Sequence, residues 1–184
     1  EELLAESVLM GAHGGVCGML PEMRAHFVGL ERADSFVVNP HKWLFTPFDL
    51  SAFYCRHMDA LKQAFSLTPE YLKTPDDAPN LSDTGVQLGR RFRSLKLWMI
   101  LRYFGAEGLR ARLREHVRLA QVLAGLVDAD PRFERMAPVP FSVVCFRANP
   151  PGQFATQEEA DAFNEALMHR INESGDIFVS HTRD

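Results

Sequence analysis

Short apolar runs alternate with longer amphipathic stretches along the 184 residues of this chain. Apolar runs bounded by turn residues predict strands at 36–38, 51–56, 133–136, 141–146 and 177–180. Apolar positions at helical spacing predict helices at 21–29, 59–65, 89–104, 108–127 and 157–172. Residues 1–10 fit either a short helix or a strand, and the polar, proline-rich stretch 68–84 predicts a long loop. Strands that alternate with helices in this way predict an α/β fold.

Glycine, proline and a capping box mark the ends of the predicted helices. Pro21 lies in the first turn of the first helix and Gly29 follows its end, while Gly105 ends the helix that starts near residue 89. Thr156 is a good N-cap, and Glu159 three residues later completes a capping box. These signals place the helix ends independently of the apolar pattern.

Composition narrows the class of protein but not its chemistry. With 46% apolar and 24% charged residues and a net charge of −4, the chain is typical of a globular protein and lacks the basic surplus of a nucleic-acid-binding protein. It contains no apolar run of about 18 residues that would cross a membrane. Cys17, Cys55 and Cys145 lie far apart without metal-ligand spacing, which predicts reduced thiols in a cytoplasmic protein.

One segment carries the candidate chemistry, Asn39-Pro40-His41-Lys42-Trp43, directly after the predicted strand 36–38. Pro40 cannot donate to a sheet and favours an extended Asn39, so the strand stops there. Lys42 follows between two aromatic side chains, where we expect its ammonium group to be desolvated. A lysine whose charged form is disfavoured is a better nucleophile and can form a Schiff base with a carbonyl. The alternative is an ordinary surface lysine beside a capping histidine.

Three segments closely resemble signatures of the group II pyridoxal-phosphate-dependent amino-acid decarboxylases, of the aromatic-L-amino-acid decarboxylase type: residues 33–44, 85–98 and 177–183. The resemblance implies the α/β type I fold of pyridoxal-phosphate enzymes, similar to aspartate aminotransferase. It also implies a homodimer that converts an aromatic L-amino acid to the amine and CO2. Family members are much longer, so the resemblance implies a C-terminal fragment. Residues 1–105 would be part of the large cofactor domain, and 106–184 a truncated small α/β domain.

The resemblance also implies roles for individual residues. Lys42 would form the internal aldimine with pyridoxal 5′-phosphate, ready for exchange with a substrate amine. Asn39 and His41 stand beside the cofactor phosphate in the family motif, and both can donate hydrogen bonds to it; alternatively they are turn residues. The arginines near residue 90 are more often a solvated or dimer-facing surface than a phosphate site. The remaining histidines have no metal-ligand spacing and are assigned to the surface or core: His13, His26, His57, His116, His169 and His181.

Two positions depart from the family pattern. Aligned without gaps on residues 12–15, Met10 stands where the family has an Asp that pairs with the pyridine nitrogen of the cofactor. Either residues 1–11 are foreign to the family segment, which we favour, or the site has changed. Leu81 stands where the family has a loop Tyr that donates a proton after CO2 is lost, and Leu cannot act as an acid.

Two functional hypotheses remain open from the sequence. The intact Asn39, His41 and Lys42 favour a decarboxylase that acts as part of a longer chain, with an amino acid as its substrate. The departures at Met10 and Leu81 favour a non-catalytic remnant that keeps only a dimerisation or interaction surface. In both cases we expect the 184-residue chain to be inactive by itself.

Overall fold

The computed structural model describes residues 8–66 and 81–182 of the chain. The chain divides into two compact units, Glu1–Arg114 and Glu115–Asp184, with the boundary inside the long helix α3 (Arg93–Ala129). A three-stranded sheet lies in the first unit and a two-stranded sheet in the second. Within the described ranges, no helix is both long and apolar enough to span a membrane.

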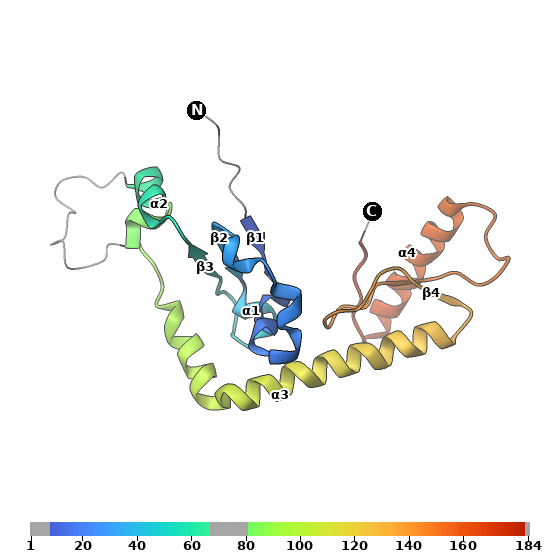
Figure 1. The fold of residues 1–184 in the computed structure, drawn as a ribbon. Coiled ribbons are helices and arrows are strands. Elements are labelled where there is room, and N and C mark those ends of the chain that lie inside the picture. The colour runs from blue at the N-terminus through green and yellow to red at the C-terminus, as the bar shows by residue number, and fades with distance from the viewer. Residues whose placement is uncertain (1–7, 67–80, 183–184) are drawn as a thin grey trace. The chain divides into compact units, whose positions relative to one another are not determined.

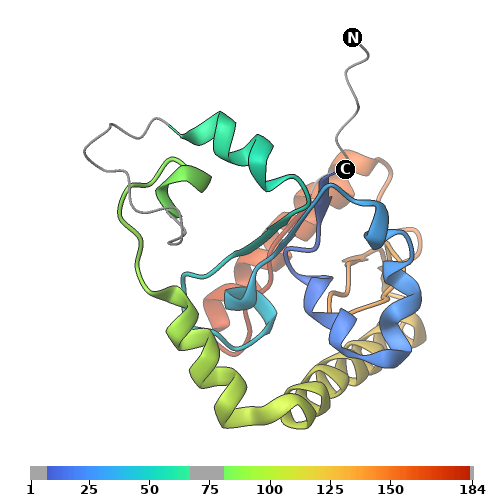
Figure 2. The ribbon, with the colours of Figure 1, turned by 60° about the vertical axis from the view of Figure 1, so that its left-hand side comes forward.

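The first unit is built on a sheet in the order β1 (Val8–Met10), β2 (Ser35–Val38) and β3 (Ala52–Cys55). β1 runs parallel to β2, and β3 runs antiparallel to it (Figures 1 and 2). Met10 lies opposite Val37, and Val38 lies opposite Ala52. The strands predicted at 36–38 and 51–56 are confirmed, and the ambiguous N-terminal stretch ends as a strand.

Short helices connect these strands. The 3-10 helices η1 (Gly14–Met19), η2 (Pro21–Phe27) and η3 (Leu30–Arg32) lie between β1 and β2, α1 (Pro40–Trp43) follows β2, and α2 (Met58–Phe65) follows β3. The helix predicted at 21–29 is thus present as a 3-10 helix with proline in its first turn. Of the predicted loop 68–84, only η5 (Leu81–Thr84) lies within the described residues.

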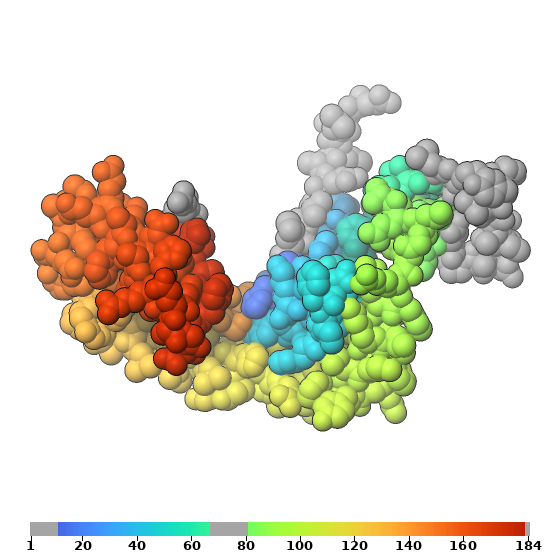
Figure 3. Space-filling model, turned by 180° about the vertical axis from the view of Figure 1, so that it is seen from behind, coloured from blue at the N-terminus to red at the C-terminus, as the bar shows by residue number. Residues whose placement is uncertain are grey.

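The core of the first unit lies between the η1–η2 segment and α3. Its fully buried side chains are Cys17, Leu20, Leu109 and Leu113. At the edge of this core, Arg110 Nε donates to the Met19 carbonyl at 3.0 Å, and the Arg114 guanidinium donates to both carboxylate oxygens of Glu22. In the space-filling view of Figure 3, the cyan segment between α1 and β3 lies against the green first part of α3.

Helix α3 begins at Arg93 rather than at Gly89, where the apolar pattern places its start. The segment before it forms a turn instead, in which the Arg93 N–H donates to the Arg91 carbonyl at 2.8 Å, and Gly89 is a poor helix former. Gly105 interrupts the helix with φ 65° and ψ 172°. The two predicted helices, 89–104 and 108–127, are therefore the two parts of α3.

The second unit places a hairpin against a helix. β4 (Phe133–Arg135) pairs antiparallel with β5 (Phe146–Ala148), and α4 (Gln157–Ser174) packs against β5. The predicted capping box begins α4, because Thr156 Oγ1 accepts the Glu159 N–H at 3.2 Å. Gly175 ends the helix in the left-handed region, with φ 76°.

The strand predicted at 141–146 is wrong. Only Phe146 of this run belongs to β5, which continues to Ala148. Val144 packs instead against a buried cluster formed by Ala120, Ala124 and Val139. Within this run, Val144 is therefore held by side-chain packing on the cluster and not by pairing in a sheet, whereas Val143 is exposed.

The strand predicted at 177–180 is also absent from the described part of the chain. The side chain of Asn172 is hydrogen-bonded to both backbone polar groups of Val179. Its Nδ2 donates to the carbonyl at 2.9 Å, and its Oδ1 accepts the N–H at 2.8 Å. A side-chain amide thus takes the hydrogen bonds that a neighbouring strand would make.

Candidate functional site

The candidate site lies where the parallel strands β1 and β2 end side by side. The Gly11 N–H donates to the Val37 carbonyl at 2.9 Å, and the Asn39 N–H donates to the Ala12 carbonyl at 3.3 Å. Open sheets with parallel strands bind ligands at the carboxyl ends of those strands. Position 10, at the end of β1, and Asn39, just after β2, therefore lie at the edge of the sheet where a ligand is expected.

Lys42 lies on α1, a single helical turn that begins at Pro40. Proline suits a first helical position because that position has no N–H bond to lose, and the preceding Asn39 is extended with φ −109° and ψ 91°. Trp43 is only 4% exposed, whereas Lys42 is exposed. The expected desolvation of Lys42 is therefore wrong for this chain, because the turn directs Trp43 inward and the lysine outward.

Asn39 holds the one buried side-chain nitrogen or oxygen without a hydrogen-bond partner in the described part of the chain, its Oδ1. Leaving such a group unpaired costs about 1–3 kcal/mol, and folded proteins contain few of them. A half-turn of the amide would place its donor nitrogen at the same point. Asn39 therefore offers a hydrogen-bonding group that a ligand could satisfy, close to Lys42 on the chain.

His41 is held through one ring nitrogen by the backbone of Leu50. Its Nδ1 lies 2.5 Å from the Leu50 carbonyl oxygen and 3.0 Å from the Leu50 nitrogen. The ring also meets Phe48 edge to face, with centroids 5.0 Å apart. Because Nδ1 is engaged, Nε2 is the ring nitrogen that could donate to an anion, in either the neutral Nε2–H tautomer or the imidazolium form.

The turn after α1 is fixed by backbone and aromatic contacts. Phe45 adopts a φ of 56°, a value that is strained for an aromatic residue. Its ring lies 6.0 Å from that of Phe104 and 5.8 Å from the Arg112 guanidinium. The Thr46 N–H donates to the Pro40 carbonyl at 3.3 Å. These contacts hold the residues that follow Lys42 and α1 in one conformation.

Arg93 connects the second sequence motif to the Lys42 segment. Its Nε and Nη2 donate to Asp49 Oδ2 at 3.2 and 2.9 Å, and this hydrogen bonding lowers the pKa of Asp49. The prediction of a solvated or dimer-facing arginine surface is therefore wrong for Arg93, which pairs with a carboxylate inside its own unit. Arg90 donates to Thr84 Oγ1 at 3.4 Å.

His13 is a residue of the site that the sequence did not single out. It precedes η1, and its ring stacks on Trp43 with centroids 4.8 Å apart and an interplanar angle of 6°. Burial, followed by the positive charge of Lys42, lowers the pKa of His13 below 6.5. His13 is therefore mostly neutral at pH 7. His13 lies within the segment 12–15 that aligns with the family pattern, but nothing in that segment indicates a contact with Trp43, so only the fold brings it to α1.

Leu81 begins η5, which packs against α2, and its side chain is exposed. An alkyl side chain here supplies no acid, as the sequence predicts. No cluster of three or more metal-ligating side chains occurs in residues 8–66 and 81–182. The chemistry that this site can perform therefore rests on the amine of Lys42 and its polar neighbours.

These neighbours fit pyridoxal phosphate. A lysine amine can bond covalently to the aldehyde, and the unsatisfied amide of Asn39 with the Nε2 of His41 could hold the phosphate. The arrangement has the residue types that such a cofactor needs, at the sheet edge where it would bind.

Comparison with known protein families identifies the family of this chain. The family model described as "Pyridoxal-dependent decarboxylase conserved domain" matches residues 10–149. Tyrosine decarboxylase 2 of Narcissus pseudonarcissus is 44% identical over an alignment 175 positions long, which covers 93% of this chain and 35% of that protein. Phenylacetaldehyde synthase of Arabidopsis thaliana is 42% identical, with the same coverage. The chain thus spans about a third of the length of these relatives.

Solved structures show the same similarity in three dimensions. The crystal structure of Oryza sativa TDC with PLP and tryptamine matches with a TM-score of 0.88 and 40% identity, over 96% of this chain and 37% of that chain. Rhodiola rosea 4-hydroxyphenylacetaldehyde synthase matches with a TM-score of 0.81 and 29% identity, over 96% of this chain and 35% of that chain. The similarity therefore covers both units of the chain.

Proposed function

This chain belongs to the pyridoxal-dependent decarboxylase family and has part of the type I fold, and from this premise we propose that it is part of a longer enzyme that decarboxylates an aromatic L-amino acid. Lys42 is the residue that binds the aldehyde of pyridoxal phosphate covalently. The relatives named tyrosine and tryptophan decarboxylases support an aromatic substrate. The activity belongs to the longer protein, because this chain spans about a third of those relatives.

The unsatisfied Oδ1 of Asn39 carries the proposal. A buried polar group without a partner is costly, and it lies at the carboxyl ends of two parallel strands, three residues before a lysine. Bound pyridoxal phosphate would supply an electron sink that stabilises the charge left on the substrate when CO2 departs. Asn39 and His41 hold the phosphate, Lys42 fixes the aldehyde end, and the buried Trp43 anchors the turn that carries all three.

The same fold supports three further proposals. Exposed apolar side chains on the first part of α3, among them Trp98 and Tyr103, support a homodimer. The free cysteines Cys17, Cys55 and Cys145 support a reducing, cytoplasmic setting. Residues 1–105 are proposed as part of the large domain and 106–184 as the small C-terminal domain.

Formation of an aldehyde is a second candidate function. Leu81 stands at the place of the family's proton-donating tyrosine, and relatives of this chain include proteins named phenylacetaldehyde synthase and 4-hydroxyphenylacetaldehyde synthase. Without that acid, the route from the decarboxylated substrate to the amine lacks its usual last proton. Release of the aldehyde instead is a two-electron oxidation, for which we propose dissolved O2 as the oxidant, with water supplying the aldehyde oxygen and ammonia and hydrogen peroxide as the other products. A non-catalytic remnant is the third candidate, favoured by the same departure and by Met10 at the end of β1.

Covalent labelling tests the role of Lys42. The chain is incubated with pyridoxal phosphate, reduced with borohydride and mapped by mass spectrometry. We expect the pyridoxyl adduct on Lys42, and its loss in the Lys42→Arg variant while background labelling of Lys62 and Lys96 is unchanged. An adduct found on Lys62, Lys73 or Lys96 and not on Lys42 would refute the assignment.

Product analysis separates the three candidate functions. The chain is extended with the missing N-terminal part of a relative and supplied with phenylalanine, tyrosine or tryptophan. The amine as main product supports decarboxylation, the aldehyde supports the synthase, and neither product despite an adduct on Lys42 supports the remnant. Leu81→Tyr should shift the product toward the amine if the missing acid is the reason for aldehyde formation.

A further inference from the structure

We propose that the ion pair between Asp49 and Arg93 positions His41 for binding the phosphate of pyridoxal phosphate. This inference rests on the proposed function, in which His41 holds that phosphate, and adds two positioning residues to it. The ring of His41 contacts the residues on both sides of Asp49. Its Nδ1 lies 2.5 Å from the carbonyl oxygen of Leu50 and 3.0 Å from the Leu50 nitrogen, and the ring meets Phe48 edge to face with centroids 5.0 Å apart. The orientation of the ring therefore depends on where this short segment lies.

Apolar packing fixes only one end of the segment. Leu50 is 5% exposed and is held in the core, whereas Phe48 is 86% exposed. Between them, Asp49 is held by Arg93, the first residue of α3, whose Nε and Nη2 donate to Oδ2 at 3.2 and 2.9 Å. Their side chains are half-buried, and a partly shielded pair with two hydrogen bonds is stronger than a pair on an open surface. The ion pair therefore fixes the part of the segment that apolar packing leaves exposed.

This arrangement leaves one ring nitrogen of His41 for a ligand. In the described part of the chain, no hydrogen bond involves its Nε2. With Nδ1 held by Leu50, the direction in which Nε2 can donate is set by the backbone of the segment. A charge-assisted hydrogen bond to phosphate depends on this direction, because the N–H must point at the oxygen. Loss of the ion pair should therefore weaken the contact with the phosphate, and not the bond between Lys42 and the aldehyde.

Positioning differs in sign from a direct effect of charge. Arg93 is a cation and Asp49 an anion, so charge alone would make Arg93→Gln weaken the binding of a phosphate and Asp49→Asn strengthen it. If the pair positions His41, both variants disturb the same contact, and both should weaken the binding of a phosphate. Asp49→Asn changes the shape of the side chain little, so the fold should be retained.

Trapping with two aldehydes on the 184-residue chain tests this role. One is pyridoxal phosphate, and the other is 5′-deoxypyridoxal, which has the same ring and aldehyde but no phosphate. After reduction with borohydride, the adduct on Lys42 is measured against aldehyde concentration. The half-saturating concentration of deoxypyridoxal divided by that of pyridoxal phosphate is the phosphate preference. We expect it to fall about 3- to 10-fold in Arg93→Gln and in Asp49→Asn.

Arg90→Gln is the charge-matched control. It removes the same charge three positions earlier, from a side chain that donates to Thr84 and not to the segment around Asp49. The phosphate preference of this variant should stay within about twofold of that of the natural chain.

Three readouts separate positioning from a purely structural role. In His41→Phe the phosphate preference should already be low, and adding Arg93→Gln should lower it no further. Arg93→Lys, which keeps a cation for Asp49, should restore part of the preference. NMR of the imidazole nitrogens, with His41 assigned by its absence from His41→Phe, should show a weaker hydrogen bond at Nδ1 in Asp49→Asn before any aldehyde is added.

The outcomes that overturn the proposal are distinct. Changes of opposite sign in Arg93→Gln and Asp49→Asn would indicate a direct effect of charge instead. Weaker trapping of both aldehydes with an unchanged phosphate preference would show that the pair only stabilises the fold. An adduct on Lys42 without any phosphate preference in the natural chain would refute the role of His41, and this inference with it. A natural chain without an adduct on Lys42 would instead refute the proposed function.

Discussion

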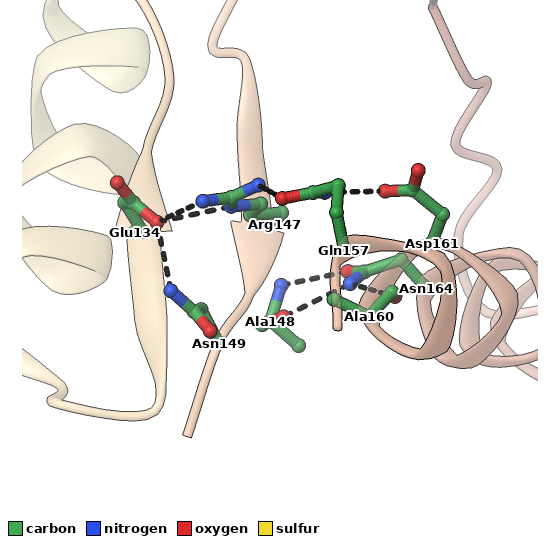
Figure 4. Close-up of polar contacts among 8 residues, drawn as sticks. All are labelled: Glu134, Arg147, Ala148, Asn149, Gln157, Ala160, Asp161 and Asn164. Atoms are coloured by element: carbon green, nitrogen blue, oxygen red, sulfur yellow. Dashed lines mark hydrogen bonds and ion pairs between the residues drawn. The ribbon is translucent and has the colours of Figure 1, made fainter. Parts of the chain in front are cut away.

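The end of β2 and the junction between β5 and α4 each contain a half-buried asparagine, and the fold satisfies only one of them. Asn164 Oδ1 accepts the Ala148 N–H at 2.7 Å, and its Nδ2 donates to the carbonyls of Ala148 and Ala160 at 2.9 and 2.8 Å (Figure 4). Asn39 has a buried Oδ1 without a partner in the described part of the chain. The fold itself satisfies the side chain of Asn164, whereas Asn39 keeps a hydrogen-bonding group that a bound ligand could satisfy.

A second set of satisfied polar groups lies next to Asn164 in the same unit (Figure 4). Arg147 donates to Glu134 through two nitrogens at 2.9 and 2.8 Å, and Asn149 donates to the same carboxylate at 3.0 Å. These hydrogen bonds, with that of Arg147 first, lower the pKa of Glu134. Gln157 continues the network by accepting from Arg147 at 3.2 Å. Because these partners all lie within the second unit, the network needs nothing further.

The contrast separates structural polar residues from candidate binding residues. A satisfied network rigidifies the elements it joins, whereas an unsatisfied buried group persists only at a cost to stability. In this chain the costly group is three residues from Lys42 in the first unit, and the satisfied ones belong to the second unit. Burial and residue type are similar at Asn39 and Asn164, so the hydrogen-bond partners distinguish the two roles.

The largest effect is expected from Asn164→Ala. The variant leaves the N–H and C=O of Ala148 without partners inside the unit, which should destabilise the β5–α4 contact by about 2–4 kcal/mol. Hydrogen exchange followed by mass spectrometry on the peptide that contains Ala148 should then be roughly 30- to 1000-fold faster.

Gln157→Ala is the matched control for this measurement, since it removes exposed hydrogen bonds at the start of the same helix and none to Ala148. Its exchange rate should rise by no more than about tenfold. Equal acceleration in both variants would mean that the hydrogen bonds from Asn164 to Ala148 stabilise the unit no more than exposed hydrogen bonds do, which would contradict the structural role given to Asn164.

A smaller, pH-dependent effect is expected from Glu22→Gln. Hydrogen bonds from Arg114 lower the pKa of Glu22 to about 2 from an ordinary 4.5. The folded state therefore favours the carboxylate, and the stabilisation is present above about pH 4.5 and is lost as the pH falls toward 2. Urea unfolding should show the natural chain more stable than Glu22→Gln at about pH 6 and equal to it near pH 2. A difference that grows as the pH falls would contradict this pairing.

The smallest effect on stability is expected from Asn39→Ala. Its Oδ1 makes no hydrogen bond to lose, so the free energy of unfolding should change by less than about 0.5 kcal/mol, or increase. Trp43 and Trp98 both lie in the first unit, so their fluorescence reports its unfolding. The affinity for pyridoxal phosphate should nevertheless fall, by about 5- to 10-fold. A loss of stability as large as that of Asn164→Ala would show that Asn39 is a structural residue.

Local signals in the sequence predict much of the fold. The run 36–38 stops at Pro40, and the capping box at Thr156 starts α4, because both signals act through the backbone of neighbouring residues. The segment with Asn39, His41 and Lys42 is contiguous, so a motif could identify it. Contacts made by side chains explain the failures. Val144 packs against Ala120 and Ala124 on α3, and Val179 is hydrogen-bonded by the side chain of Asn172, seven positions earlier. The apolar pattern by itself does not distinguish such partners from a neighbouring strand.

The candidate site is also only partly predictable from the sequence. The sequence predicts a buried Lys42 because aromatic residues flank it, but a single helical turn directs neighbours to different sides, and only Trp43 is buried. The stacking of His13 on Trp43 and the pairing of Arg93 with Asp49 join residues 30 and 44 positions apart. Such pairs depend on how the chain is folded back on itself, which the spacing of residue types does not encode.

Gly105 has a consequence for how this sequence can diverge. Its φ of 65° with ψ of 172° falls in a region open almost only to glycine, although no atom would lie within 4 Å of an added Cβ. Gly175, with φ 76° and ψ −2°, adopts a conformation that asparagine also tolerates. We therefore expect natural variants to have either glycine or asparagine at position 175. Position 105 should remain glycine in these variants. Its constraint is the backbone torsion and not a clash with a neighbouring side chain, so no second mutation of a neighbour could relieve it.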